Sequence, residues 1–452
     1  FTPHIAHECL KYIQTMLAKV VDSTHSVLKS KESIRERINT LPEEVNAFLV
    51  RLSNDYGGVV GVRDVENDFP GVDINYFREI LEQSSLASVV DIDWHQFGIR
   101  HEGLTFVVFH EVLSLILLEK DNDSSSIAKE GALEGEFLSN MSLFFEMIES
   151  GKVRFTNKGT VYKSTGKRLA ESLLLSHDRE WCQFDILEEA FDFAVKKEFL
   201  TEAGEGSFVL TKKASFFLKS SSLEKQQAVL RWAIVNKKTP GQLVHQIPIR
   251  RYVLCFIQSM IPGHWYDAAD LAILARHYYL AMVTSGEVFP LNQSSFPDRG
   301  APNFQELTWD ALAWIRKYLH LGGVCDLGYD GNDQLIAIRL SALGARLFNM
   351  SLPDGFDSVG HIVVNPDFEV VLFPMPNSHC LTSSLDVIAE RERKDNLYHY
   401  RLSQESVRRS LKSGWTAKKI LAFLENNSST PLPQNVTYSL QDWIKCDVER
   451  VS

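Results

Sequence analysis

One outline recurs along this chain: a helix followed by a two-stranded hairpin whose second strand runs into another helix. It is clearest at 184–218 and 307–348, where the returning strands continue into the similar phrases VLTKKASFFL and IRLSALGARLF. An earlier example, WHQFGIRHEGLTFVVFHEV, reads as a strand, a turn near Glu102-Gly103 and a return strand that enters a helix. Helices followed by a hairpin are typical of winged-helix domains, so the recurrence predicts winged helices in tandem rather than a solenoid.

Breaks between the periodic segments divide the chain into parts. The strongest linker signal is VFPLNQSSFPDRGAPNF, within 286–306, which is rich in proline and turn-forming residues. Because helical patterns outnumber strands, the predicted fold class is α+β, mainly α. The predicted divisions are N-terminal helices with a first winged helix (1–120), a second winged helix (136–220), a helical connector (221–300), a third winged helix (301–357) and a small mixed α/β domain (358–452).

Composition excludes several classes of protein. With 44% hydrophobic and 23% charged residues, the 452-residue chain is ordinary for a globular protein. No apolar run approaches about 18 residues, which predicts no membrane partner. FTPHIAHECL lacks the basic region and apolar core of a signal peptide, and six scattered cysteines without a CxxC pair favour a reducing cytoplasm. The net charge of −11 argues against a coating of nucleic acid but allows a local basic stripe.

Motifs for catalysis and metal binding are incomplete. GTVYKSTGKR (159–168) has six residues between its glycines instead of four, and Arg168 stands where a P-loop needs a hydroxyl for magnesium. His101 and His110 are too far apart to match the HExxH zinc motif, whose histidines share one helical face. The sequence therefore predicts no metal site, no cofactor and no catalytic residue, hence a protein that is not an enzyme.

A nuclease pattern is the sharpest enzymatic alternative. GHIVVNPDFEVVLFP (360–374) with Glu392-Arg393-Lys394 spells PD…ExK, in which Asp367 and Glu392 would hold Mg²⁺ and Lys394 would polarise water. That chemistry needs Glu392 and Lys394 on a strand beside the aspartate. AERERKDN instead reads as a charged helix end, on which residues two apart diverge by about 200°. We therefore interpret Asp367 as a turn former, and a Mg²⁺-dependent nuclease is the less favoured alternative.

Two basic clusters are the candidate binding sites. Residues 152–168 contain no acidic residue, and Ser, Thr, Gly and Tyr162 lie between the charges, so this patch fits DNA backbone contacts and a solvated surface equally. The second cluster, in RRSLKSGWTAKK (408–419), favours a solvated helix face or a protein contact. The predicted DNA-binding residues are Lys152, Arg154, Lys158, Lys163, Lys167 and Arg168, and the predicted partner-binding residues are Arg408, Arg409, Lys412, Trp415, Lys418 and Lys419.

The last domain resembles a known family. GHIVVNPDFEVVLFP followed by YRLSQESVRRSLKSGWTAKKILAFLENNSSTPLPQNVTYSLQDW (400–443) resembles the N-terminal domain of XPB-type DNA helicases. It is also similar to the bacterial helicase-associated proteins that carry this domain without a motor. The overall layout resembles the winged-helix accessory subunit of TFIIH, which uses a comparable last domain to pair with XPB.

The resemblance implies a non-catalytic protein of a DNA transaction, related to repair, a helicase or transcription. The favoured hypothesis is a DNA-binding accessory protein whose winged helices contact the backbone of the duplex. The alternative is a scaffold that docks a helicase or another DNA-processing protein through residues 358–452. An XPB helicase would continue into two motor lobes, so the resemblance leaves open a stand-alone accessory protein or a fragment.

Overall fold

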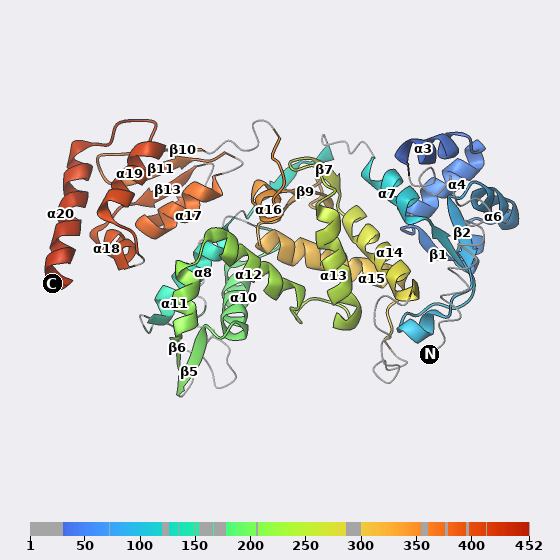
Figure 1. Cartoon of the computed structure of the whole chain (residues 1–452), viewed down its shortest axis with the longest axis horizontal. Helices are drawn as coiled ribbons and strands as arrows, with labels where there is room; N and C mark the ends of the chain where they lie inside the picture. Colours follow the sequence, from blue (N-terminus) through green and yellow to red (C-terminus); the bar gives the residue numbers. More distant parts are fainter. Residues whose placement is uncertain are drawn as a thin grey trace.

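The structure is a computed structural model of the chain. It describes residues 30–71, 73–119, 126–133, 135–149, 151, 153, 166, 178–204, 207–285, 300–353, 360–375, 378–394, 397–412 and 414–451. It is mixed α and β with small sheets and mainly helical, as predicted. Along the long axis, the N-terminal module lies at one end and residues 360–451 at the other, with the rest of the chain between them (Figure 1). Within the described ranges, no helix is both long and apolar enough to cross a membrane.

The N-terminal module packs its helices against a three-stranded antiparallel sheet in the order β1-β3-β2. The Asp73 side chain accepts the backbone N–H groups of Asn75 and Tyr76 and so caps the first turn of the helix that begins at Ile74. The elements are α3 (Lys31–Asn39), α4 (Glu43–Asn54), β1 (Val59–Gly61), α5 (Val62–Asp68), α6 (Ile74–Gln83), β2 (Ala87–Val90), β3 (Thr105–Val108) and α7 (His110–Leu118).

The first predicted hairpin is wrong in one strand. The partner of β3 is β2, whereas Trp94–Phe97 forms the 3₁₀ turn η1. The Asp93 side chain accepts the N–H of His95 at the start of this turn, and Gly98, with φ of 71°, ends it. The indole N–H of Trp94 donates to Thr105 Oγ1 at 3.0 Å in the core. Local capping at both ends therefore outweighs the strand-like alternation of the segment.

The second module contains the predicted hairpin at 200–210, which is confirmed. Its core is aromatic: Phe199 and Phe217 lie 4.7 Å apart between ring centroids, and Phe193 packs edge-on against both. These contacts hold the helices on one side of the hairpin. The elements are α8 (Glu136–Glu149), α10 (Gln183–Lys196), β5 (Leu200–Gly204), β6 (Ser207–Leu210) and α11 (Lys212–Lys219).

The third module is larger than the predicted third winged helix (301–357). Its sheet has the order β4-β8-β9-β7, and β7 comes from the segment predicted to be a purely helical connector (221–300). The order α13-β7-α14-α15-β8-β9 repeats the order α4-β1-α5-α6-β2-β3 of the N-terminal module. In both, the strand before the helix pair joins the second strand of the hairpin. The elements are α12 (Ser222–Ile234), α13 (Leu243–Ile257), β7 (Trp265–Asp267), α14 (Asp270–Ser285), α15 (Phe304–Trp314), the π-helical turn η4 (Ile315–Leu319), β8 (Cys325–Tyr329), β9 (Leu335–Leu340), α16 (Ala342–Leu347) and, from before α8, β4 (Lys129–Gly131).

A buried arginine joins the first and third modules. Arg276 on α14 donates to the carbonyl oxygens of Tyr56 and Gly57 at 3.2 and 2.5 Å, and to that of Phe304 at 3.4 Å. Burial lowers the pKa of Arg276 to about 9. Gly57 has a φ of 64°, and a Cβ there would lie 2.3 Å from the Arg276 guanidinium, so only glycine fits.

The last module, residues 360–451, has its own core. Its antiparallel sheet has the order β10-β11-β13-β12, and its buried apolar cluster is formed entirely by residues between 362 and 444. The predicted helices after Ser403 and Thr416 are confirmed, and Gly414, with φ of 90°, separates them. The elements are β10 (His361–Val364), β11 (Glu369–Phe373), α17 (His379–Ile388), β12 (Glu390–Lys394), β13 (Tyr398–Arg401), α18 (Gln404–Lys412), α19 (Ala417–Asn427) and α20 (Gln434–Val451).

The prediction that AERERKDN ends a helix is wrong. Helix α17 ends at Ile388, and Glu390–Lys394 forms strand β12, which pairs with β13. Arg391 is buried, with 2% of its side chain exposed, whereas Arg393 is exposed and lies opposite His399. The inward arginine finds a carboxylate partner in Asp386, so a strand can bury this charged sequence on one side.

Candidate functional site

The turn between β10 and β11 contains Asp367, for which the sequence leaves two roles: a metal ligand of a nuclease or a turn former. The N–H of Phe368 donates to the carbonyl of Asn365 at 3.1 Å, and Asp367 Oδ1 accepts the N–H of Glu369 at 3.2 Å. Phe368 has a positive φ of 70°. Asp367 therefore forms the turn with its side chain, as predicted.

Glu392 lies on a strand in the same sheet, so the helical premise used against a nuclease is wrong. Its carboxylate, however, pairs with the Arg401 guanidinium, which also donates to the backbone carbonyl of Asp367 at 3.2 Å. Glu369 accepts a hydrogen bond from His399 at 2.8 Å, and this bond holds the pKa of Glu369 below its ordinary value. Across the described ranges, no three His, Cys, Asp or Glu side chains are arranged to hold a metal ion.

The second predicted cluster lies on α18, α19 and the turn between them, and we call its exposed part the basic surface. Arg408 and Lys412 are exposed one helical turn apart, and Lys418 and Lys419 are exposed at the start of α19. The Lys419 ammonium lies 4.3 Å from the centre of the Trp415 ring, a cation–π contact. The basic surface is therefore Arg408, Lys412, Lys418 and Lys419, beside the half-buried Trp415.

Two residues of the predicted cluster also hold the module together. Arg409 is half-buried and donates to the carbonyl of Ala389 at 3.2 Å, at the junction of α17 and β12. Trp415 packs edge-on against Phe423, with ring centroids 5.9 Å apart. These contacts fix α18 and α19 in place and leave the other four side chains facing solvent.

Charge is distributed unevenly between this module and the rest. Residues 360–452 contain eleven acidic and eleven basic residues, so the whole formal charge of −11 belongs to residues 1–359. Five of the eleven basic residues lie within 408–419, which contains no acidic residue. The basic surface is thus a local concentration of positive charge on an otherwise balanced module.

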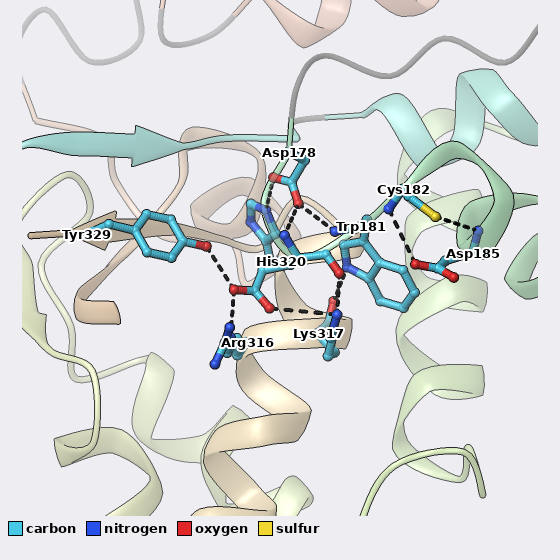
Figure 2. Close-up of polar contacts among 9 residues, drawn as sticks. Asp178, Trp181, Cys182, Asp185, Arg316, Lys317, His320 and Tyr329 are labelled. Atoms are coloured by element: carbon cyan, nitrogen blue, oxygen red, sulfur yellow. Dashed lines mark hydrogen bonds and ion pairs between the residues drawn. The ribbon is translucent and has the colours of Figure 1, made fainter. Parts of the chain in front are cut away.

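The other predicted cluster cannot be placed. Lys152, Arg154, Lys158, Lys163, Lys167 and Arg168 lie outside the described residues. The described chain resumes at Asp178, ten residues beyond that segment, and from there it enters a polar cluster that we call the clasp, in which the two carboxylates and the histidine are buried. The clasp consists of Asp178, Glu180, Trp181, Arg316, Lys317, His320 and Tyr329. All of these except Glu180 are labelled in Figure 2.

An aspartate–histidine pair forms the first half of the clasp. Asp178 Oδ2 lies 2.8 Å from His320 Nε2, with 3% and 0% of their side chains exposed (Figure 2). The other ring nitrogen of His320 lies 3.1 Å from the carbonyl oxygen of Cys325. Both ring nitrogens therefore lie within hydrogen-bonding distance of an oxygen acceptor. Because the ring is buried and both nitrogens are engaged within the chain, the pair is suited to holding the chain and not to general base catalysis.

The pKa of Asp178 is determined by its burial and by the groups that bond to its carboxylate. Burial raises the pKa of the carboxyl, but the hydrogen bond and charge of His320 lower it, and so do the backbone N–H groups of Glu180 and Trp181. The net result is a pKa below the ordinary value. Asp178 is therefore ionised at neutral pH.

Glu180 forms the second half of the clasp. Its carboxylate, 1% exposed, lies 2.6 Å from Arg316 Nε and accepts the Tyr329 hydroxyl at 3.0 Å. The Trp181 indole N–H donates to the carbonyl of Lys317 at 3.0 Å. Arg316 and Lys317 belong to η4, so this half ties the chain entering α10 to the third module. Nothing in SHDREW alone predicts the clasp, because its partners are far away in the sequence.

A second buried contact, which we call the latch, joins the last module to α8. Arg391 makes bonds of 2.8 Å to both carboxylate oxygens of Asp386, and its other terminal nitrogen lies 4.0 Å from Glu136 on α8. Ser139, also on α8, donates to Asp386. The rings of Tyr398 and Tyr400 flank the guanidinium at 5.6 and 5.4 Å. The latch holds one orientation of the last module relative to α8.

Two of the helices that precede the hairpins are negatively charged. By their Asp, Glu, Lys and Arg residues, α6 carries a net charge of −1 and α10 of −3, whereas the −2 of α15 is balanced by Arg316 and Lys317 of η4, which continues it. In helix-turn-helix proteins the second helix lies in the major groove, between rows of phosphates. Negative helices at this place are repelled by that groove.

Comparison with known proteins concerns the last module. A family model described as helicase conserved C-terminal domain matches residues 362–446, which include the sheet and the basic surface. No curated protein matches the chain. Residues 362–446 are thus similar to a conserved domain of helicases.

Proposed function

We propose that the chain is a non-catalytic accessory protein of a DNA transaction such as repair, acting in the cytoplasm. In this proposal its last module docks a helicase, with a helicase of XPB type as the expected partner. The observation that carries the proposal is the helicase-family match on a module with its own core and a concentrated basic surface. Exposed cations beside a fixed aromatic ring suit an acidic patch on another protein.

The charge of the remaining modules supports a protein contact over readout of a DNA groove. Helices α6 and α10, which precede the first two hairpins, are negative, and residues 1–359 carry the entire net charge of −11. Small helix-and-hairpin modules can bind either proteins or DNA, so the fold alone does not decide between these two uses. The charge of the modules is the feature that distinguishes them. By Asp, Glu, Lys and Arg residues, the negative charge is concentrated in residues 1–135, which carry −10, whereas residues 136–220 carry −1 and residues 221–357 are neutral. An acidic N-terminal part and a basic surface on the last module suit a scaffold with separate contact surfaces.

Reversing charge on the basic surface tests docking. We expect Lys412→Glu combined with Lys418→Glu to weaken binding of the full chain to an XPB-type helicase of its own organism roughly tenfold, mainly by slowing association. Biolayer interferometry across a salt series measures both rates. Lys445→Glu, an exposed lysine of α20, is the matched control and should bind like the unaltered chain. Equal loss in the control, or no binding by the unaltered chain, would contradict docking through this surface.

A second candidate function is DNA backbone binding by the segment 152–168. The clasp favours it, because the chain is buried and held at Asp178, ten residues after Arg168. Phosphate contacts fix the position of a protein on DNA, which suits a basic segment that is followed in the sequence by a fixed anchor.

The test is binding of the full chain to labelled duplex DNA across a salt series. Charge reversal at Lys158, Lys163, Lys167 and Arg168 should reduce the slope of log K against log salt by up to about 3.6, at about 0.9 for each lost phosphate contact. An unchanged slope would remove this candidate while leaving docking untouched.

A further inference from the structure

Helix α11 has a composition unlike its surroundings. Its sequence, KKASFFLK, has three lysines and no acidic residue, whereas α10 in the same module has a net charge of −3. In a chain with a net charge of −11, this is a local positive element that no predicted site includes. It follows the hairpin of the second module directly, after β6.

The helical period sorts these residues into two faces. Ala214 and Phe217 are buried and face the module. At about 100° per residue, Lys212, Phe216 and Lys219 then lie on the opposite face, with Ser215 beside them. We call these four residues the crest of α11. Phe216 is 74% exposed, more than any other large hydrophobic side chain among the described residues.

The lysines on the crest are free to meet a ligand. Lys213, on the flank of the helix, pairs with the exposed carboxylate of Glu198. Lys212 and Lys219 form no ion pair with any residue that the structure describes, and both are exposed. Two full turns separate them, which is about 10 Å along the axis, and Phe216 lies between them.

We propose that the crest of α11 binds single-stranded nucleic acid. An unpaired base stacks on the ring of Phe216, and Lys212 and Lys219 bind phosphates on either side. An exposed aromatic ring flanked by cations is the arrangement by which proteins hold single strands without reading their sequence. Stacking a base on this ring removes its apolar surface from water, which favours binding.

A single strand suits the crest better than a duplex or an acidic protein. In a duplex the faces of the bases are stacked on one another, so no base face is available to stack on the ring of Phe216. Stable binding of a protein partner needs a wide area from which water is excluded around the central side chain of the interface. The crest offers only one aromatic ring, surrounded by two lysines and a serine. The inference rests on α11 and is independent of docking through the last module.

The test is fluorescence anisotropy of the full chain with a labelled oligothymidine across a salt series. Phe216→Ala should weaken binding about five- to 150-fold, the range for one stacked base, and leave the salt slope unchanged. Lys212→Gln with Lys219→Gln should instead reduce the slope by about 1.4, at about 0.7 for each single-strand phosphate. The two kinds of variant thus separate stacking from charge.

Two controls make the test decisive. Phe216→Leu keeps an apolar side chain but removes the ring, so it should bind as weakly as the alanine variant. Tyr438→Ala removes a 70% exposed ring from α20 and should bind normally. The proposal is overturned if the full chain does not bind the oligonucleotide at low salt, if Phe216→Ala binds normally, or if Phe216→Leu restores binding and an acidic polypeptide competes as well as the oligonucleotide. Helicase docking remains measurable in each of these outcomes.

Discussion

Asp178→Asn should lower the free energy of unfolding by about 3–5 kcal/mol at neutral pH, the range for breaking a buried ion pair by removing one partner. The substitution replaces the carboxylate beside the buried His320 ring with a neutral amide. Water cannot compensate, because less than a twentieth of either side chain is exposed. Urea denaturation followed by tryptophan fluorescence measures the loss, since Trp181 is part of the clasp.

The same variant should change how stability depends on pH. The pKa of Asp178 in the folded chain lies below the ordinary value of 3.8, so the ionised carboxylate stabilises the fold above that value. This contribution is lost as the pH falls through the lowered pKa. The unaltered chain should therefore lose clasp stability in acid below about pH 4, and Asp178→Asn should lack that part of the loss.

An exposed pair provides the matched control. Asp333 pairs with Lys129 at 2.8 Å and with Arg179, and both interactions lower its pKa. Its side chain is about half exposed, so solvent screens the pairing and Asp333→Asn should scarcely shift the urea midpoint. A shift as large as that of Asp178→Asn would show that burial of the clasp has no special effect.

Features fixed by neighbouring residues could be predicted from the sequence. The cap at Asp73, the turn at Pro366-Asp367 and the helix stop at Gly414 all depend on contacts within a few residues. The hairpins at 200–210 and 325–340 likewise follow from alternation and turn residues. These local signals place the elements but not their partners.

Features fixed by distant partners could not be predicted. Strand β7 has three residues and is recognisable only through its pairing with β9. Strand β12 reads as a helix end until Arg391 is seen to meet Asp386 and the tyrosines of β13. His320 finds Asp178 from 142 residues away, and no spacing in the sequence encodes that.

The basic surface, too, could be predicted from the sequence only in part. The sequence identifies the cations of 408–419 but not which of them are available to a partner. Arg409 and Trp415 are committed to the module through Ala389 and Phe423, while Lys412 and Lys418 face solvent. Only packing distinguishes an arginine that holds a helix from one that can meet another protein.

Arg391→Met should have the largest effect in the last module, again about 3–5 kcal/mol, because it leaves the Asp386 carboxylate and Glu136 without their cation. Only 2% of the Arg391 side chain is exposed, and those of Asp386 and Glu136 are 11% and 4% exposed. We expect both a lower unfolding temperature and release of the module from α8. Calorimetry measures the first, and the radius of gyration from small-angle X-ray scattering measures the second.

Replacing the groups of α8 alone separates these two effects. Glu136→Gln with Ser139→Ala removes the α8 side of the latch but leaves Arg391 bonded to Asp386 within the last module. This variant should increase the radius of gyration while the module, which has its own core, stays folded. A buried ion pair between modules selects one orientation more than it adds stability, since desolvation offsets most of its attraction. If the double variant keeps the compact dimensions, the orientation of the last module is set by contacts other than the latch.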